Sequence, residues 1–139
     1  MNISVRNQLV ATITALEKGA VNTMVTLKMP GGSQLASIIT NEAVSGLQLQ
    51  TGEMVKAFFK ASHVLLATGG VPNISARNKL EGTARKVTKG AVNSEVNIVL
   101  PDGDVVTSIV TNEAVSALGI KEGDSVVAVI KATDVMIAK

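Results

Sequence analysis

The chain has 139 residues, of which 46% are hydrophobic but only 1% aromatic, and it contains no cysteine. The absence of cysteine excludes disulfides, thiolate metal sites and cysteine nucleophiles. A formal net charge of +2 is far from that of a polycation. No apolar run is long enough to cross a membrane, and the first residues lack the parts of a signal peptide, so we expect a cytoplasmic protein.

The first half of the chain begins with three predicted strands. Small or apolar residues alternate with polar ones on both sides of a turn at Gly19, and Pro30-Gly31-Gly32 predicts a second turn, because proline fixes one dihedral angle and glycine permits a positive φ. The pattern predicts strands over 8–16, 25–29 and 35–39.

The period then changes from that of a strand to that of a helix. Thr40 is a capping residue, Glu42 is an acid in the first turn, and Val44 and Leu47 lie three residues apart. These features predict a short helix over 40–47. Two further strands are predicted over 54–60 and 64–67.

The second half of the chain repeats the first. Ser4–Thr68 aligns with Ser75–Lys139 without a gap, and nearly half of the aligned pairs are identical. Core packing requires only apolar residues of suitable volume, so a repeat that also keeps serines, lysines and an arginine indicates two copies of one binding surface.

The element order predicts the fold class. Three strands, a helix and two strands are the order of the OB-fold, whereas an SH3-like barrel usually lacks the helix. We therefore predict an all-β chain of two tandem OB-fold-like five-stranded barrels, each with one short helix between strands three and four. The predicted domains are 1–68 and 75–139, joined by a Gly/Pro linker over 69–74. Domains of about 65 residues are near the limit of independent stability, which favours an oligomer.

The repeated residues do not form a catalytic set. The single histidine, His63, corresponds to Asp134 in the second repeat, so a duplicated active site cannot depend on it. There are no duplicated carboxylate pairs, no Ser-His-Asp set and no phosphate-binding loop. Glu42 and Glu113 stand alone, which is too few ligands for a divalent cation. We therefore expect a binding protein and not an enzyme.

Hydrogen-bond donors dominate the repeated polar residues. The cations present in both copies are Arg6 and Arg77, Lys18 and Lys89, and Lys60 and Lys131. Serine hydroxyls, turn amides and amides at the start of the helix add further donors. Each feature alone has a structural explanation, such as a helix cap or a solvated strand end, but their joint recurrence favours an anion site.

The motifs Ser-x-Arg-Asn, Lys-Gly-Ala-Val-Asn, Ile-(Ile/Val)-Thr-Asn-Glu-Ala and Lys-Ala-(Ser/Thr) occur in this order in both halves. Each half thereby resembles a Mop domain, and the whole chain is similar to a di-Mop molbindin. The resemblance implies OB-type barrels, a homotrimer of two-domain chains, and molybdate or tungstate as the ligand without an organic cofactor. It also implies a cytoplasmic role in molybdenum storage, buffering or homeostasis.

The resemblance implies two classes of oxyanion site between units. The first class would use Ser4, Val5, Arg6, Lys60, Ala61 and Ser62 with Thr40 and Ala43 of a neighbouring unit, and likewise Ser75, Ala76, Arg77, Lys131, Ala132 and Thr133 with Thr111 and Ala114. The second class, around a threefold axis, would use Ala20, Val21 and Asn22, and Ala91, Val92 and Asn93. Many Mop domains carry serine where this chain has Ala43 and Ala114, so only backbone contact is expected there.

Two alternative functions fit the same barrels. A nucleic-acid-binding OB module would need basic grooves and aromatic stacking platforms, whereas this chain has only Phe58 and Phe59. A purely structural assembly module would use the repeated polar residues to maintain interfaces. In that case, replacement of Arg6 and Arg77 should break the trimer, not only abolish oxyanion uptake.

Overall fold

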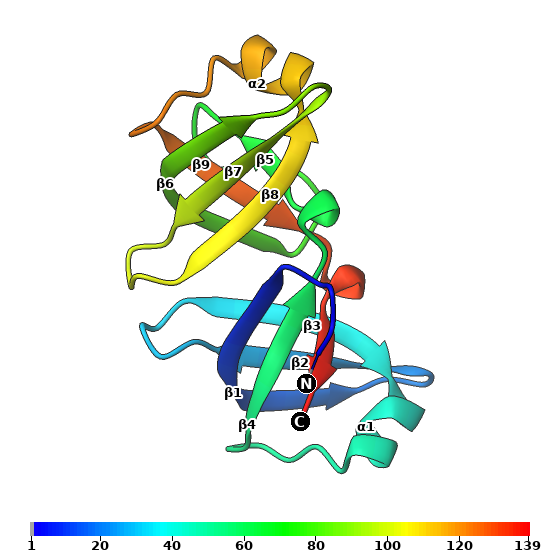
Figure 1. The fold of residues 1–139 in the computed structure, drawn as a ribbon. Coiled ribbons are helices and arrows are strands. Elements are labelled where there is room, and N and C mark those ends of the chain that lie inside the picture. The colour runs from blue at the N-terminus through cyan, green and yellow to red at the C-terminus, as the bar shows by residue number, and fades with distance from the viewer. Residues whose placement is uncertain (1) are drawn as a thin grey trace.

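The computed structural model describes residues 2–139 as two curled five-stranded sheets, each with one short α-helix (Figure 1). This confirms the predicted all-β class and the predicted place of each helix between a third and a fourth strand. The strand and helix boundaries agree with the predictions to within a few residues.

The first repeat forms β1 (Asn7–Lys18), β2 (Asn22–Lys28), β3 (Gln34–Thr40), α1 (Asn41–Leu47), β4 (Met54–Phe59), the 3₁₀ turn η1 (Ala61–His63) and β5 (Leu65–Ala67). The second repeat forms β6 (Asn78–Lys89), β7 (Asn93–Val99), β8 (Val105–Thr111), α2 (Asn112–Leu118), β9 (Ser125–Ile130), the 3₁₀ turn η2 (Ala132–Asp134) and β10 (Met136–Ala138). Within the described residues, neither α-helix approaches the length and apolarity that a membrane-spanning helix needs.

The two repeats exchange their last strands. The sheet orders are β10-β4-β1-β2-β3 and β5-β9-β6-β7-β8, so each sheet takes one edge strand from the other repeat. Met136 pairs with Phe58, and Leu65 pairs with Val129. The sheets therefore cross the boundaries predicted at 1–68 and 75–139. Because the repeats offer nearly equivalent edges at β4 and β9, the sequence pattern of a last strand fits either edge.

Buried serines hold the residues that lead into the exchanged strands. The Ser37 hydroxyl on β3 donates a hydrogen bond to the Val135 carbonyl at 2.6 Å, and the Ser108 hydroxyl on β8 donates to the Val64 carbonyl at 2.7 Å. Both serines are fully buried. Each bond links the far edge of a sheet to the start of the exchanged strand and so brings the two edges of the curled sheet together.

Two buried asparagines also join the barrels. The Asn7 amide donates to the Thr107 carbonyl and accepts from the Thr107 N–H, both at 2.8 Å. Asn78 makes the same pair of bonds with the Ala36 carbonyl and N–H, at 2.8 and 2.7 Å. The asparagine of the Ser-x-Arg-Asn motif therefore has a structural role, because it fixes the start of one repeat against a strand of the other.

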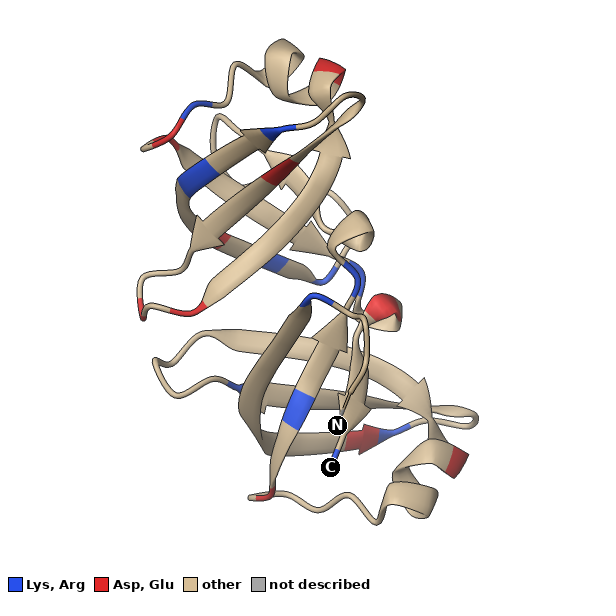
Figure 2. Cartoon of the chain, in the orientation of Figure 1, with Lys and Arg blue, Asp and Glu red and all other residues tan. Residues whose placement is uncertain are grey.

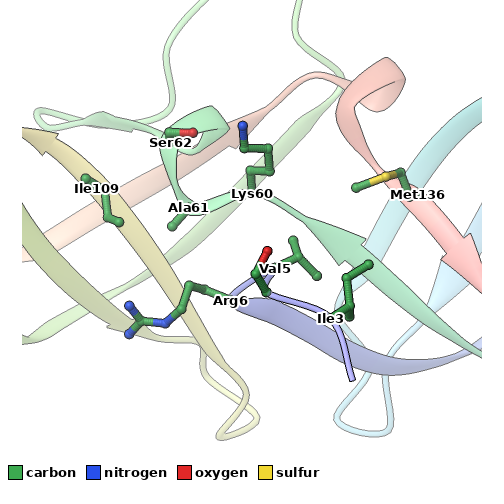
Figure 3. A pocket seen from close by; sticks show the side chains of 9 residues that line it. Ile3, Val5, Arg6, Lys60, Ala61, Ser62, Ile109 and Met136 are labelled. Carbon is green, nitrogen blue, oxygen red and sulfur yellow. The ribbon is translucent and has the colours of Figure 1, made fainter. Parts of the chain in front are cut away.

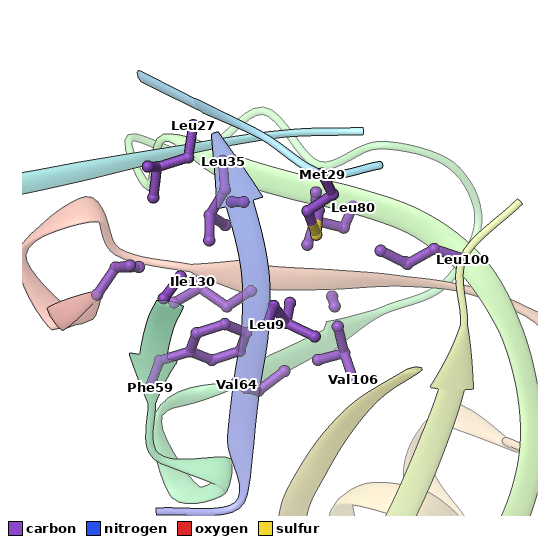
Figure 4. Close-up of a cluster of buried hydrophobic side chains, with 14 of the residues drawn as sticks. Leu9, Leu27, Met29, Leu35, Phe59, Val64, Leu80, Leu100, Val106 and Ile130 are labelled. Atoms are coloured by element: carbon purple, nitrogen blue, oxygen red, sulfur yellow. The ribbon is translucent and has the colours of Figure 1, made fainter. Parts of the chain in front are cut away.

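The hydrophobic core is continuous between the barrels. One cluster of buried side chains contains residues of both repeats, and Figure 4 shows Leu9, Val64, Leu80, Val106 and Ile130 within it. Buried residues occupy alternate positions on β1, β2 and β7, as expected for sheets with one buried face, whereas β9 is buried at five consecutive positions. The shared core fixes how the two barrels meet, and the candidate site lies at that junction.

Candidate functional site

Two hollows lie where the barrels meet, and the repeat relates one to the other. The first has a volume of about 340 Å³ and is lined by Ile3, Ser4, Val5, Arg6, Lys60, Ala61, Ser62, Ile109 and Met136. The second has a volume of about 260 Å³ and is lined by Ile38, Leu65, Ile74, Ser75, Ala76, Arg77, Lys131, Ala132 and Thr133. Every lining position of one hollow corresponds to a lining position of the other.

The structure thereby brings together two motifs that the sequence separates by more than fifty residues. Ser4 and Arg6 precede β1, whereas Lys60 and Ser62 lie at η1, and all four side chains are exposed around the first hollow. Figure 3 shows the Lys60 ammonium beside Ser62, with Arg6 extended in a different direction. Buried Ala61 lies between Lys60 and Ser62 and anchors the turn in the core.

The hollows are basic. Figure 2 shows Lys and Arg gathered where the barrels meet, and the first hollow contributes Arg6 and Lys60 while the second contributes Arg77 and Lys131. Among the described residues, no aspartate or glutamate lines either hollow. Two cations and two hydroxyls per hollow supply donors to an anion, whereas a carboxylate in the lining would repel it.

Each arginine reaches across to the opposite barrel, but the two arginines meet different partners there. Arg6 Nη2 lies 2.7 Å from Glu95 Oε1 on β7, in an ion pair between partly exposed side chains. Arg77 Nη2 lies 3.0 Å from the Met24 sulfur on β2. Met24 and Glu95 occupy equivalent positions in the two repeats. The equivalent arginines therefore contact a thioether in one case and a carboxylate in the other.

The predicted site segment over 40–43 lies away from the hollow within one chain. Thr40 is the N-cap of α1, where its hydroxyl accepts from the Ala43 N–H at 3.0 Å, and the Asn41 N–H donates to the Val21 carbonyl at 2.8 Å. Thr111 and Ala114 repeat the capping bond at 3.1 Å. The Ala43 and Ala114 amides are therefore already bonded, and their contact with an anion bound by a neighbouring unit stays a prediction.

The second predicted set, in the β1–β2 turn, lies next to the start of α1. Ala20, Val21 and Asn22 are all exposed, and the Asn41 amide ties this turn to the helix by donating to the Gly19 carbonyl at 3.0 Å. The second repeat is alike, with Ala91, Val92 and Asn93 exposed and Asn112 donating to the Gly90 carbonyl at 2.9 Å. The structure thus joins the turn to the helix start and places both outside the hollow.

Steric crowding explains why glycine occupies each of these turns. A Cβ on Gly19 would lie 3.0 Å from the Asn22 carbonyl oxygen, and one on Gly90 would lie 2.8 Å from that of Asn93. Both contacts are closer than nearly all real Cβ contacts. The repetition of Lys-Gly-Ala-Val-Asn therefore follows in part from the tight turn and not only from a ligand.

The sequence interpretation missed the apolar walls of the hollows. Ile109 and Met136 line the first hollow, and Ile38 and Leu65 line the second, in each case from the other repeat. Met136 and Leu65 lie on the exchanged strands. The positions of Met136 and Leu65 depend on which sheet edge these strands join. The repeat pattern does not indicate which edge that is.

Outside the hollows, the described residues form few clusters of titratable or metal-binding side chains. Within residues 2–139, no group of three His, Cys, Asp or Glu side chains is close enough to hold a metal ion. His63 Nδ1 lies 3.8 Å from Asp134 Oδ1, and these two residues occupy equivalent positions of the repeats. The cationic hollows are therefore the candidate functional site.

Comparison with known protein families identifies the family to which this chain belongs. The TOBE domain model matches residues 3–66 and, a second time, residues 74–137. The chain belongs to the TOBE domain family. Its two matched segments correspond to the two repeats, so this is a tandem TOBE chain.

Relatives of the tandem TOBE chain have names that refer to molybdenum. It is 39% identical to the molybdenum transport protein ModE of Herbaspirillum seropedicae, over 99% of this chain and 52% of that protein. It is 38% identical to the molybdenum-pterin-binding protein MopA of Rhodobacter capsulatus, again over 99% of this chain and 52% of the relative. The chain thus spans about half the length of these curated relatives.

A solved structure matches the tandem TOBE chain over almost its whole length. The crystal structure of the cytoplasmic molybdate-binding protein ModG with molybdate bound is 46% identical, covers 99% of both chains and superposes with a TM-score of 0.94. The resemblance to tandem Mop proteins, drawn from the motifs, is confirmed, as is the fold of two β-barrels.

Proposed function

We propose that this chain binds molybdate or tungstate in the two hollows and acts as a cytoplasmic store or buffer of the oxyanion, not as an enzyme. The observation that carries the proposal is the duplicated hollow, which is lined by an arginine, a lysine and two residues with hydroxyls, and by no carboxylate among the described residues. The molybdenum-related names of the relatives support the choice of anion.

The chemistry of the ligand fits these residues. Molybdate is a tetrahedral dianion near neutral pH, and its oxygens only accept hydrogen bonds. Arginine and lysine supply charge-assisted donors, and hydroxyls can rotate to donate. Sulfate carries the same charge, so selection of the larger anion would depend on the size of the closed site.

We further propose that the site is completed by other copies of the chain, in a trimer. A hollow of about 340 Å³ is in the range of small organic ligands, so a five-atom anion leaves most of it empty. Val21 and Val92 are 69% and 70% exposed in the β1–β2 and β6–β7 turns, which suits contact with other copies. A site shared between chains would make oxyanion binding stabilise the oligomer.

Titration calorimetry with molybdate and sulfate in parallel tests the proposal. We expect the wild-type chain to bind molybdate and to bind sulfate far more weakly, and we expect the double variant Arg6→Ala, Arg77→Ala to lose molybdate binding. The matched control Arg85→Ala, Lys86→Ala removes the same charge from exposed positions that line neither hollow, and it should bind as the wild type does. Absence of molybdate binding, or equal uptake of sulfate, contradicts the proposal.

The same arginine variant separates ligand binding from a purely structural role. Native mass spectrometry should find the double variant in the same oligomer as the wild-type chain, because Arg6 and Arg77 contact Glu95 and Met24 of their own chain. Dissociation of the double variant into single chains would favour a structural assembly module.

A further inference from the structure

We infer that the two hollows have unequal affinities for the oxyanion, because Glu95 competes with the oxyanion for Arg6, whereas no carboxylate within residues 2–139 is paired with Arg77. The hollow of Ser75 and Arg77 should therefore fill before the hollow of Ser4 and Arg6. This inference rests on the proposed function and adds a residue that sets the order of filling.

The two arginines contact partners of different charge. Arg6 Nη2 and Glu95 Oε1 are 2.7 Å apart, so the guanidinium is engaged by a full negative charge. Arg77 instead contacts the Met24 thioether, which is a weak acceptor without net charge. Arg77 can turn toward an anion without breaking an ion pair, whereas Arg6 has to give up its carboxylate.

Strand pairing places Glu95 close to the first hollow. In the β7–β8 ladder Glu95 is paired with Ile109, and Ile109 lines the first hollow. Met24 is paired in the same way with Ile38, which lines the second hollow. The Glu95 carboxylate thus lies beside the rim of the first hollow, where it repels a dianion even after Arg6 has moved.

Other differences between the hollows leave their charge unchanged. Ser62 is replaced by Thr133, which keeps the hydroxyl, and Met136 is replaced by Leu65, which keeps an apolar wall. His63 follows Ser62 and Asp134 follows Thr133, but these two side chains face each other and line neither hollow. Glu95 is therefore the acid that distinguishes one hollow from the other through a contact with a lining cation.

The test measures each hollow separately. In an Arg77→Ala background, which leaves the first hollow intact, Glu95→Met should raise the molybdate affinity about tenfold, because an exposed ion pair and a repulsion are both removed. In an Arg6→Ala background, the reciprocal change Met24→Glu should lower the affinity of the second hollow about tenfold for the same reasons. Glu81→Met, which removes an exposed acid that lines neither hollow, is the control and should change neither affinity.

Calorimetry with molybdate gives the readout for every variant, and thermal unfolding verifies that each is folded. Opposite shifts from Glu95→Met and Met24→Glu support the inference. Unchanged affinities in variants that still bind molybdate overturn the inference and leave the proposed function standing. A wild-type chain that takes up no molybdate overturns the proposed function and the inference with it.

Discussion

Gln48 and Gly119 occupy the same position of the two repeats, directly after α1 and α2, and both adopt left-handed backbone geometry. Their φ angles are 51° and 66°. A side chain makes this conformation unfavourable, whereas glycine adopts it freely. The second helix thus ends with the residue suited to its geometry, and the first helix ends with local strain.

Replacement of Gln48 by glycine should therefore stabilise the protein, by about 0.5–1 kcal/mol once the larger chain entropy of glycine is included. The bond from Lys139 to the Gln48 carbonyl uses the backbone and remains possible. Urea denaturation measures the change. The reciprocal variant Gly119→Gln, at a position with open space around a Cβ, should lose a similar amount. A lower unfolding midpoint for Gln48→Gly would contradict this reading.

At the scale of elements, β10 has only three residues and is anchored at both ends. Ser37 holds the residue before it, and Lys139 holds its other end by donating to the Leu47 carbonyl and to Glu53, both at 2.8 Å. A cation suits the C-terminal end of α1. The hydrogen bond from Lys139 lowers the pKa of the Glu53 carboxyl. The equivalent of Lys139 in the first repeat is Thr68, so β5 lacks this anchor.

Replacement of Lys139 by alanine should loosen β10 without affecting β5. Hydrogen exchange should become several-fold faster for amides in the β10–β4 ladder, because local opening of an edge strand needs less free energy when an anchor is lost. Thr68→Ala, at the equivalent exposed position, should leave exchange in the β5–β9 ladder unchanged.

The pH dependence of this effect follows from the lowered pKa of Glu53. The contribution of the Lys139–Glu53 contact to protection is fully present above the ordinary pKa of the carboxyl and is lost as the pH falls through the lowered value. The difference in exchange rate between the wild type and Lys139→Ala should therefore become smaller at acid pH, where only the Lys139 bonds to the Leu47 and Gln48 carbonyls remain. Equal exchange rates in the two proteins at neutral pH would exclude this anchor.

The sequence predicted the elements and the donor motifs but not how the repeats combine. Alternation, turns and caps are local signals, so the strands and both helices followed from them. The partner of the last strand is a long-range choice between two similar edges, and no local pattern encodes it. The apolar wall at Met136 depends on that choice, and the wall at Ile109 and the contact of Arg6 with Glu95 are also long-range contacts between the repeats, so all three were missed.

At the scale of the whole molecule, equivalent residues of the two repeats meet where the barrels touch. His63 faces Asp134, and Gly31 lies against Asp102. A Cβ added to Gly31 would lie only 1.6 Å from the Asp102 Cβ. The repeats differ at both places, and at Gly31 the reason is plain, since two identical aspartates would collide and repel each other.

Restoring the repeat at this contact should therefore destabilise the protein. Gly31→Asp adds a side chain where backbone geometry allows one but where Asp102 fills the space, so we expect a loss of about 1–3 kcal/mol of unfolding free energy, as for overpacking. Thermal unfolding in moderate salt measures the loss. The double variant Gly31→Asp, Asp102→Gly moves the single carboxylate to the other side of the contact and should recover most of the stability. If the double variant stays as unstable as Gly31→Asp, the cause lies in the turn itself, and the two barrels do not need unlike residues where they meet.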